Sequence, residues 1–355
     1  MRRLTLMLAI ATLFAIALLV NSESRPAAAQ SGRPAGTTIT GKAFRFSQVK
    51  PGIYHAIGTG AMQVVGNSTI IVNDADAMIV DDHVSPAAAW MLVEELKTIT
   101  DKPVTTVVNT HFHFDHAHGN QIFAPAVQII GHEFTRRMLL GKPLAMPLYQ
   151  SYIGGMPGQI ETLRKRIAEE KDPAALAKLR TQLQSTENNL ASQKELRPTP
   201  PNVTLTTEMT LHRGDREIQI RYLGRGHTAG DVVVFLPRER VVITGDLLTS
   251  GLSNMSDSYP LEWAASLEEL KKLDFDTVVP GHGEAYTDRT KIDAFQAYLR
   301  DVWTEVSRLK KEGVPSEEAA KRADLTKHKG RLPIQGPGVP ILAAQRIYEL
   351  LDSSR

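Results

Sequence analysis

The sequence predicts an α/β protein in which two β-sheets pack face to face and helices cover their outer sides. Strand-like runs rich in β-branched residues occur on both sides of a charged, helix-like stretch. On each side these runs are followed by alternating helix and strand patterns, so a β-rich and then βα half occurs twice. This repetition is the main evidence for two sheets, and the charged stretch between the halves is expected to be an insertion.

The first half contains the strand-like runs "GIYHAIG", "AMQVVG", "STIIVN" and "DAMIVDD", bounded by Gly, Asn and Asp. A helix is expected over "SPAAAWMLVEELKTI", with Ser85 as N-cap and Pro86 in its first turn. Its residues at helical spacing are Trp90, Val93, Leu96 and Lys97. The buried strand "PVTTVVNT" then leads into a histidine-rich segment. These histidines therefore lie at the carboxyl end of a strand, where open α/β sheets bind ligands.

The insertion, at about residues 141–201, is expected to form two helices. Asp172 and Pro173 provide the N-cap and the first-turn proline of the second helix, so a helical hairpin is predicted. Apolar residues at helical spacing are Ile160, Leu163, Ile167, Leu176, Leu179, Leu183 and Leu190. Two interpretations remain open: a solvated insertion or dimer contact, and a lid over the active site.

The second half repeats the pattern of the first. Its strand-like runs are "NVTLTTEMTLH", "REIQIRYLG", "DVVVFLP", "RVVITGD" and "DTVVPGHG", and its helices are "PLEWAASLEELKKL" and "RTKIDAFQAYLRDVWTEVSRL". Together the halves predict one domain over residues 49–310. Residues 311–355 are interpreted as a C-terminal helical extension, to which the sequence assigns no function.

The N-terminus differs in composition from the rest of the chain. Arg2 and Arg3 precede an uncharged apolar run at residues 4–20, and the alanines at 27–29 suit a signal peptidase. Residues 1–29 therefore predict a bacterial signal peptide and a periplasmic or secreted protein, by the Sec or the Tat route. An uncleaved membrane anchor is the alternative. Residues 30–48, rich in Ser, Gly, Pro and Thr up to Thr40, are expected to be a flexible lead-in.

Charge and composition exclude several classes of function. Without residues 1–29 the chain has 38 basic and 38 acidic residues, so nothing in its charge favours nucleic-acid binding. The absence of cysteine excludes disulfides, thiolate ligands, iron–sulfur clusters and a cysteine nucleophile. A small-molecule substrate is the expected partner, with no stable membrane anchor if the signal is cleaved, and a homodimer is compatible with the sequence.

The segment "NTHFHFDHAHGN" places four histidines and an aspartate within eight positions of a chain that has eleven histidines. His111 and His113 are two residues apart, so in an extended chain both imidazoles project the same way. Three later strand ends, in "GRGHTAGD", "VVITGDLL" and "VVPGHGEA", add His227, Asp246 and His282. Crowding these groups without a cation would be costly, and the donors suit zinc or another divalent metal.

The pattern H-x-H-x-D-H, a single His, an Asp and a final His resembles the metallo-β-lactamase-fold hydrolases, over roughly residues 111–283. The resemblance implies a four-layer αβ/βα sandwich with two divalent ions, expected to be zinc, with iron or manganese as alternatives. It implies His111, His113 and His227 at the first metal and Asp115, His116 and His282 at the second, with Asp246 bridging both. Asp81 in "MIVDD" matches a position that supports the ligands by hydrogen bonding.

The resemblance also implies a hydrolytic mechanism. A metal-bound hydroxide would attack a carbonyl carbon, and Asp115 would act as the catalytic residue that orients the nucleophile and carries a proton to the leaving group. Asp246 occupies a position where many zinc β-lactamases have Cys or Ser, and where glyoxalase-II-like, lactonase-like and phosphodiesterase-like relatives have Asp. This difference lowers the expectation of β-lactam hydrolysis without excluding it.

The sequence thus predicts an exported dinuclear zinc-dependent hydrolase of an ester, lactone, thioester or β-lactam. A dedicated β-lactamase is the most specific alternative. A mononuclear-iron oxidoreductase related to sulfur dioxygenases is the alternative from another class, and a non-catalytic binding module is a third.

Several other residues near these motifs have expected roles outside the ligand set. His118 is expected to pack or to bond at a helix end, His132 to begin a helix, and His83 to lie in a surface loop or to line the pocket. Asn254, Ser256 and Tyr259 follow Asp246 in a loop that should border the pocket, where they would contact substrate or satisfy backbone groups. Nothing is assigned to His55, His212 or His328.

Overall fold

The computed structural model describes residues 36–123 and 125–353. The predicted signal peptide lies outside these residues. Within them, eight strands form one sheet in the order β1 to β8. They are β1 (Thr38–Thr40), β2 (Phe44–Lys50), β3 (Ile53–Gly58), β4 (Ser68–Val72), β5 (Ala77–Val80), β6 (Val104–Val108), β7 (Gln128–His132) and β8 (Val203–Leu205). β1 to β5 pair antiparallel and β5 to β8 pair parallel.

The second sheet has the order β13-β12-β11-β10-β9 in the described part of the chain. Its strands are β9 (Glu208–Arg213), β10 (Arg216–Tyr222), β11 (Val232–Leu236), β12 (Val241–Gly245) and β13 (Thr277–Pro280). Only β12 and β13 pair parallel here. β1 and most of β2 lie within residues 30–48, so the expectation of a flexible lead-in up to residue 48 is wrong for Thr38 to Thr40 and from Phe44 onwards.

The two sheets pack face to face, as the repeated pattern predicted. Neighbouring residues on a strand point to opposite faces, so Ile71 of β4 joins the core between the sheets whereas Ile70 joins the core on the outer side. Ile220, Val234 and Ile243 of the second sheet complete the core between the sheets. Burial on both faces explains why these strands are almost continuously apolar.

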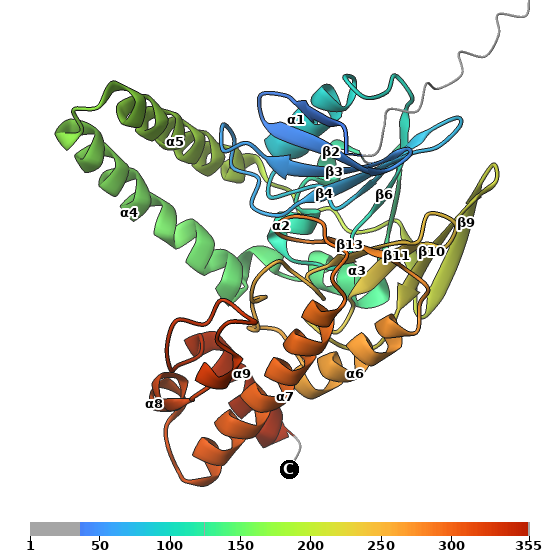
Figure 1. Cartoon of the computed structure of the whole chain (residues 1–355). Coiled ribbons are helices and arrows are strands. Elements are labelled where there is room, and N and C mark those ends of the chain that lie inside the picture. Colours follow the sequence, from blue (N-terminus) through green and yellow to red (C-terminus); the bar gives the residue numbers. More distant parts are fainter. Residues whose placement is uncertain (1–35, 124, 354–355) are drawn as a thin grey trace, which may run out of the picture. The chain divides into compact units, whose positions relative to one another are not determined.

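Helices cover both outer faces and give four layers. α1 (Pro86–Leu96) packs on the first sheet, and α6 (Pro260–Lys271) and α7 (Thr290–Lys311) pack on the second (Figure 1). Ser85 caps α1 as predicted, because its side chain accepts from the amide of Ala88 at 3.2 Å. Trp90, one of the residues at helical spacing, is 54% exposed, so it lies on the solvent-facing side of α1. The buried residues are the smaller Ala88 and Ala89 with Leu92 and Leu96, and the alanines let the helix approach the sheet closely.

The insertion forms the predicted helical hairpin. α4 (Pro147–Glu169) and α5 (Pro173–Ser192) run side by side (Figure 1), and the Asp172 carboxylate accepts from the amide of Ala175 at 2.7 Å. α4 begins earlier than its apolar stripe indicated and continues through Pro157. Because Pro157 and three nearby glycines are poor helix formers, this first part of α4 has no helix signal in its sequence.

The C-terminal extension packs on the same core as the second sheet. α8 (Ser316–Arg322) contributes Ala319 and Ala320, and α9 (Ile341–Ser353) contributes Ile347 to the cluster that includes α6 and α7. The remaining short helices are α2 (Phe114–Ala117), η1 (Asn120–Ile122), α3 (Glu133–Leu140), η2 (Pro143–Ala145), η3 (Gln193–Glu195) and η4 (Thr326–His328). Among residues 36–123 and 125–353, no helix combines the length and hydropathy of a transmembrane segment.

Candidate metal centre

The carboxyl ends of four strands meet at one edge of the sandwich and carry the predicted donors. β6 leads into the segment that starts the cluster, and β10, β12 and β13 are each followed by one further donor. The predicted donors are His111, His113, Asp115, His116, His227, Asp246 and His282. The structure brings all seven together, although they come from distant parts of the chain.

The donor atoms form two groups that share a carboxylate. His111, His113 and His227 are one group and Asp115, His116 and His282 the other, and the donor atoms of each group lie within 4.8 Å of one another. Asp246 touches both groups. Its Oδ2 is 3.5 Å from His227 Nε2, and its Oδ1 is 3.3 Å from His116 Nε2. This is the position expected of a bridging ligand.

The spacing of the donors fits a divalent ion. His227 Nε2 is 2.9 Å from His113 Nδ1, and His282 Nε2 is 3.3 Å from Asp115 Oδ2. Two donors at ~2.0–2.1 Å from one tetrahedral zinc ion would be about 3.3 Å apart. Moreover, His111 Nε2 and Asp246 Oδ1 are buried without a hydrogen-bond partner among the described residues. Each such atom costs about 1–3 kcal/mol, which a coordinated cation would offset.

The electrostatics of the two groups also favour a cation. Burial lowers the pKa of His227 to about 3 and the pKa of His111 well below its ordinary value, so both imidazoles are neutral and have a free lone pair. Burial acts on His116 too, but the carboxylates of Asp115 and Asp246 outweigh it and raise its pKa well above the usual range. The second group therefore attracts positive charge.

Asp81 supports the cluster from the end of β5, as predicted. Its Oδ2 is 2.8 Å from His116 Nδ1, so the other ring nitrogen of His116 points to the donors. The same carboxylate accepts from the amide of Thr110 at 2.7 Å and from its hydroxyl at 2.8 Å. Asp81 adopts a φ of 62°, and these three bonds hold it in that uncommon conformation.

Glycines allow the strand ends to approach one another. A Cβ added to Gly281 would lie 2.1 Å from Asp246 Oδ1, and one added to Gly245 would lie 2.3 Å from Thr110 Oγ1. Both contacts are too short for any side chain. The glycines beside Asp246 and His282 in the sequence motifs are therefore required for the donors to converge.

Asp257 is a functional candidate that the sequence did not reveal. Its Oδ2 is 3.1 Å from His113 Nε2, on the side of the ring opposite the donor atom Nδ1. Burial tends to raise the pKa of Asp257, but the hydrogen bond and charge of His113 hold it below the ordinary value. A carboxylate in this place fixes the ring orientation and tautomer of a ligand histidine. Its only sequence signal was a position in the loop after Asp246.

A cavity of about 470 Å³, called the cluster cavity here, opens beside the donors. His113, Asp115, Asp246 and His282 line it together with the loop from Thr249 to Asn254 and with Leu148 of α4. Asn254 lies in this lining as predicted, and its side chain also accepts from the amide of Ser256 at 2.8 Å. The first turn of α4 thus borders the site, at the base of the hairpin.

Tyr259 lies elsewhere, and its prediction as a pocket residue is wrong. Its ring is held between the guanidinium groups of Arg225 and Arg346, whose Cζ atoms are 4.4 and 4.7 Å from the ring centroid. Ser256 does not line the cluster cavity either, and its hydroxyl donates to Asp257 at 2.9 Å. The first part of the loop, from Thr249 to Asn254, therefore lines the cavity, whereas Ser256 and Tyr259 make their contacts outside it.

The remaining histidines of the sequence analysis have structural roles. His132 begins α3 as predicted, since its Nδ1 accepts from the amide of Phe134 at 3.1 Å. His118 is buried against Phe114 and Tyr149, in agreement with a packing role. His83 is fully buried, stacks on Phe44 and lies 2.8 Å from Ser68 Oγ. The expectation that His83 lies in a surface loop is wrong.

Comparison with protein families and curated sequences gives consistent matches. A model described as the metallo-beta-lactamase superfamily matches residues 62–282, a range that contains every predicted donor. The linear primary-alkylsulfatase of Pseudomonas sp. (strain ATCC 19151) is 24% identical over 272 residues, covering 71% of this chain and 48% of that protein. The type 2 metallo-beta-lactamase of Bacteroides fragilis is 25% identical over 228 residues, covering 62% and 70%.

The type 2 metallo-beta-lactamase of Bacillus sp. (strain 170) is 36% identical over 86 residues, covering 22% of this chain and 34% of that protein. The chain thus spans half or less of the length of the first curated relatives it matches. Among solved structures, VMB-1 aligns with a TM-score of 0.51 and 17% identity, covering 74% of this chain and 98% of that chain. The DIM-1 metallo-beta-lactamase aligns with a TM-score of 0.50 and 19% identity, covering 74% and 99%. These structures share the fold.

Proposed function

The chain belongs to the metallo-β-lactamase superfamily, and on that premise we propose that it is a metal-dependent hydrolase with two divalent ions, most favourably zinc. The convergence of seven donors into two groups that share Asp246 carries this proposal. His111, His113 and His227 would hold one ion, Asp115, His116 and His282 the other, and Asp246 both. A donor set of this size favours two ions over the single iron of a sulfur dioxygenase-like oxidoreductase.

When bound, the ions would polarise the substrate carbonyl and lower the pKa of water in the site. The protein's own residues have three tasks. Asp81 and Asp257 hold the rings of His116 and His113 through their second nitrogens. Asp115 borders the cluster cavity, where it can orient an attacking water and pass a proton to the leaving group. Burial keeps the imidazoles of His111 and His227 neutral, so that their lone pairs are available to an ion.

The substrate class we propose is an ester, lactone, thioester or β-lactam, attacked at its carbonyl carbon. Asp246 keeps its interpretation as a glyoxalase-II-like bridging ligand, which favours the first three over a dedicated β-lactamase. One relative, similar over 71% of this chain, is named a linear primary-alkylsulfatase, so a sulfate ester is a second candidate substrate. The cluster cavity of about 470 Å³ is large enough for a small molecule of any of these classes.

We further propose that residues 1–29 direct export, so that the mature enzyme acts in the periplasm or outside the cell. The apolar run at residues 4–20 and the alanines at 27–29 support this. A homodimer remains a prediction from the sequence.

A substrate panel tests the proposal. The mature protein is stripped of metal, reconstituted with zinc, and assayed with nitrocefin, a lactone, a thioester, a phosphodiester and an alkyl sulfate, with metal content measured in parallel. We expect hydrolysis of at least one carbonyl substrate only after reconstitution, and its loss in His116→Ala and Asp246→Ala variants that keep the fold. Equal activity with and without metal, or one iron per chain together with oxygen consumption, would contradict the proposal.

A further inference from the structure

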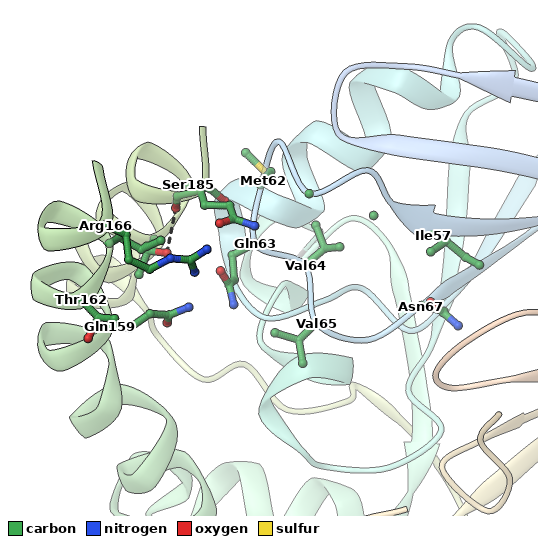
Figure 2. Close-up of a pocket in the computed structure, with 15 residues that line it drawn as sticks. Ile57, Met62, Gln63, Val64, Val65, Asn67, Gln159, Thr162, Arg166 and Ser185 are labelled. Carbon is green, nitrogen blue, oxygen red and sulfur yellow. Dashed lines mark hydrogen bonds between the residues drawn. The ribbon is translucent and has the colours of Figure 1, made fainter. Parts of the chain in front are cut away.

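We propose that a second cavity, between the helical hairpin and the β3–β4 loop, binds an anionic group of the substrate through Arg166. This inference rests on the proposed hydrolase function and adds a substrate class to it. The cavity, called the hairpin pocket here, has a volume of about 670 Å³. Figure 2 shows Gln159, Thr162 and Arg166 on the hairpin side and Met62 to Val65 on the loop side.

Arg166 has a free positive charge in this pocket. Its neighbours on α4 are paired, since Arg164 lies 2.7 Å from Glu187 and Lys165 lies 3.0 Å from Glu161. In contrast, no carboxylate of residues 36–123 and 125–353 lies within 4.0 Å of the Arg166 guanidinium. Figure 2 shows this side chain extending from α4 toward Gln63 of the loop. A planar guanidinium with all of its donors free is suited to a carboxylate or sulfate.

Neutral donors line the same pocket as the guanidinium. The side-chain amides of Gln63, Gln159 and Gln182 line the pocket, and none has a hydrogen bond to another part of the described chain. Amide N–H groups can donate to an anion beside an arginine without repelling either charge. Apolar side chains complete the lining, among them Met62, Val64 and Leu163. The pocket therefore combines an apolar wall with a cationic end.

A short piece of backbone separates the hairpin pocket from the metal centre. Asn67 lines the hairpin pocket, and its Nδ2 donates to the Gly283 carbonyl at 2.8 Å, while Gly283 lines the cluster cavity. A Cβ added to Gly66 would lie 2.8 Å from the Asp115 carbonyl oxygen and 3.1 Å from His116 Cε1. The Gly66–Asn67 backbone therefore contacts the metal centre on one side and borders the hairpin pocket on the other.

The loop itself has the features of a ligand-contacting segment. Val65 is a β-branched residue with a φ of 50°, and it is 41% exposed. Such a conformation is strained for valine, and strain of this kind concentrates where a chain contacts ligands. An exposed valine beside the pocket offers an apolar surface. We expect it to contact the apolar spacer of the substrate, between the reacting carbonyl group and the anionic end. The chemical class is thus an acyl compound with a short apolar spacer and a terminal carboxylate or sulfate.

Two esters of equal length provide the kinetic test. 4-Nitrophenyl pentanoate is neutral, whereas mono-4-nitrophenyl glutarate has a carboxylate in place of the terminal methyl group. We expect Arg166→Gln to raise the ratio of the glutarate KM to the pentanoate KM by about three- to tenfold, a range that allows for solvent screening of an exposed charge. Arg166→Lys should restore part of this difference. Arg180→Gln removes a positive charge from α5 outside the pocket and should leave the ratio unchanged.

A binding measurement separates this inference from the proposed function. The zinc-loaded wild type, Arg166→Gln and Arg180→Gln proteins are titrated with N-methylglutaramate, a monoanionic amide that resists hydrolysis, by isothermal titration calorimetry. Weaker binding in Arg166→Gln alone, with a difference that shrinks in high salt, supports the anion site. Equal affinity in all three proteins, or no binding by the wild type, overturns it. If the wild type hydrolyses neither ester, the proposed esterase activity fails while the calorimetry still decides on the pocket.

Discussion

At the scale of single residues, the metal centre depends on side chains that do not touch the proposed ions. Asp81 and Asp257 each bond one ring nitrogen of a donor histidine, so the other nitrogen faces the cluster. Asp81 follows a strand and matched a known pattern, so the sequence predicted it. Asp257 lies in a loop without periodicity, and its partner His113 is far away in the chain, so no local signal could reveal it.

Asp257→Asn is predicted to lower zinc affinity by roughly 10- to 100-fold, because the ring of His113 loses the charged acceptor that fixes it. Zinc competition with a chromophoric chelator measures this directly. Ser256→Ala removes only a hydroxyl that donates to the same carboxylate at 2.9 Å, and it should have a smaller effect. An Asp257→Asn protein that binds zinc as tightly as the wild type would show that His113 is oriented by other contacts.

His55 predicts a pH dependence of stability that is separate from the metal centre. It is buried on β3, and burial, with a smaller contribution from Arg45, lowers its pKa from 6.5 to about 4. The unfolded chain therefore takes up a proton first as the pH falls. Stability from this group is complete above about pH 6.5 and decreases toward pH 4, by up to about 3 kcal/mol in total.

The measurement is urea unfolding of the metal-free wild type and His55→Gln proteins between pH 7 and pH 4. The free energy of unfolding should fall more steeply with acidification in the wild type, whatever constant offset the substitution causes. Parallel curves for the two proteins would mean that His55 is not neutral in the folded state at pH 5.

At the scale of elements, the C-terminal extension holds the loop that follows Asp246. Arg346 of α9 donates from Nε to the Ser258 carbonyl at 3.0 Å, and its guanidinium covers one face of Tyr259. Ser258 is adjacent to Asp257, so the extension supports the loop that positions His113. The sequence assigned no function to residues 311–355, because this support arises only when α9 folds back onto a loop many residues earlier.

Arg346→Ala is predicted to destabilise the protein by about 1–3 kcal/mol, through loss of a charged hydrogen bond and a cation–π contact. Hydrogen exchange should become faster in the loop from Thr249 to Tyr259. Glu349→Gln is the matched control, because it removes only the exposed ion pair of Arg346 at 3.2 Å, which contributes little. If hydrogen exchange in that loop were unchanged in Arg346→Ala, the C-terminal extension would not stabilise the loop beside the metal centre.

The sequence predicted features of helices and loops correctly where they depend on residues a few positions apart. It failed where they depend on packing between distant parts of the chain. Ser85 and Asp172 cap their helices as predicted, because an N-cap bond involves residues three apart. Trp90 matched the helical period but is exposed, because the residues of α1 that face the sheet are Ala88, Ala89, Leu92 and Leu96. Tyr259 was expected to line the pocket because it follows the metal-ligand motif. Its ring instead packs between Arg346 of α9 and Arg225 of the loop before β11, two contacts that no local sequence pattern indicates.

At the scale of the whole molecule, the fold and the donor set were predictable for one shared reason. Buried strands are apolar until they end, so a polar residue directly after a strand marks the sheet edge where ligands bind. Asp246 directly follows β12 and His282 lies two residues after β13, whereas His227 lies in the loop five residues after β10. The hairpin pocket could not be predicted in this way, because its lining comes from a loop and from helices whose relative placement no sequence pattern determines.

The same convergence predicts that folding and metal binding are coupled. Seven donors from both sheets lie at one edge, and buried atoms such as His111 Nε2 and Asp246 Oδ1 have no partner in the described chain, so the folded state gains the full binding energy of the ions. Binding at a free metal concentration about 1,000 times the Kd adds about 4 kcal/mol of stability for each ion. For a protein of this size, removing the ions should therefore lower the Tm by roughly 10 °C or more. Differential scanning calorimetry after chelation, and again after zinc is restored, measures this change.

The control is Asp246→Asn, which weakens the ligand shared by both groups. The Tm difference between its metal-free and zinc-loaded forms should be smaller than in the wild type. An identical Tm for the stripped and reconstituted wild type would mean that the seven side chains bind no stabilising cation.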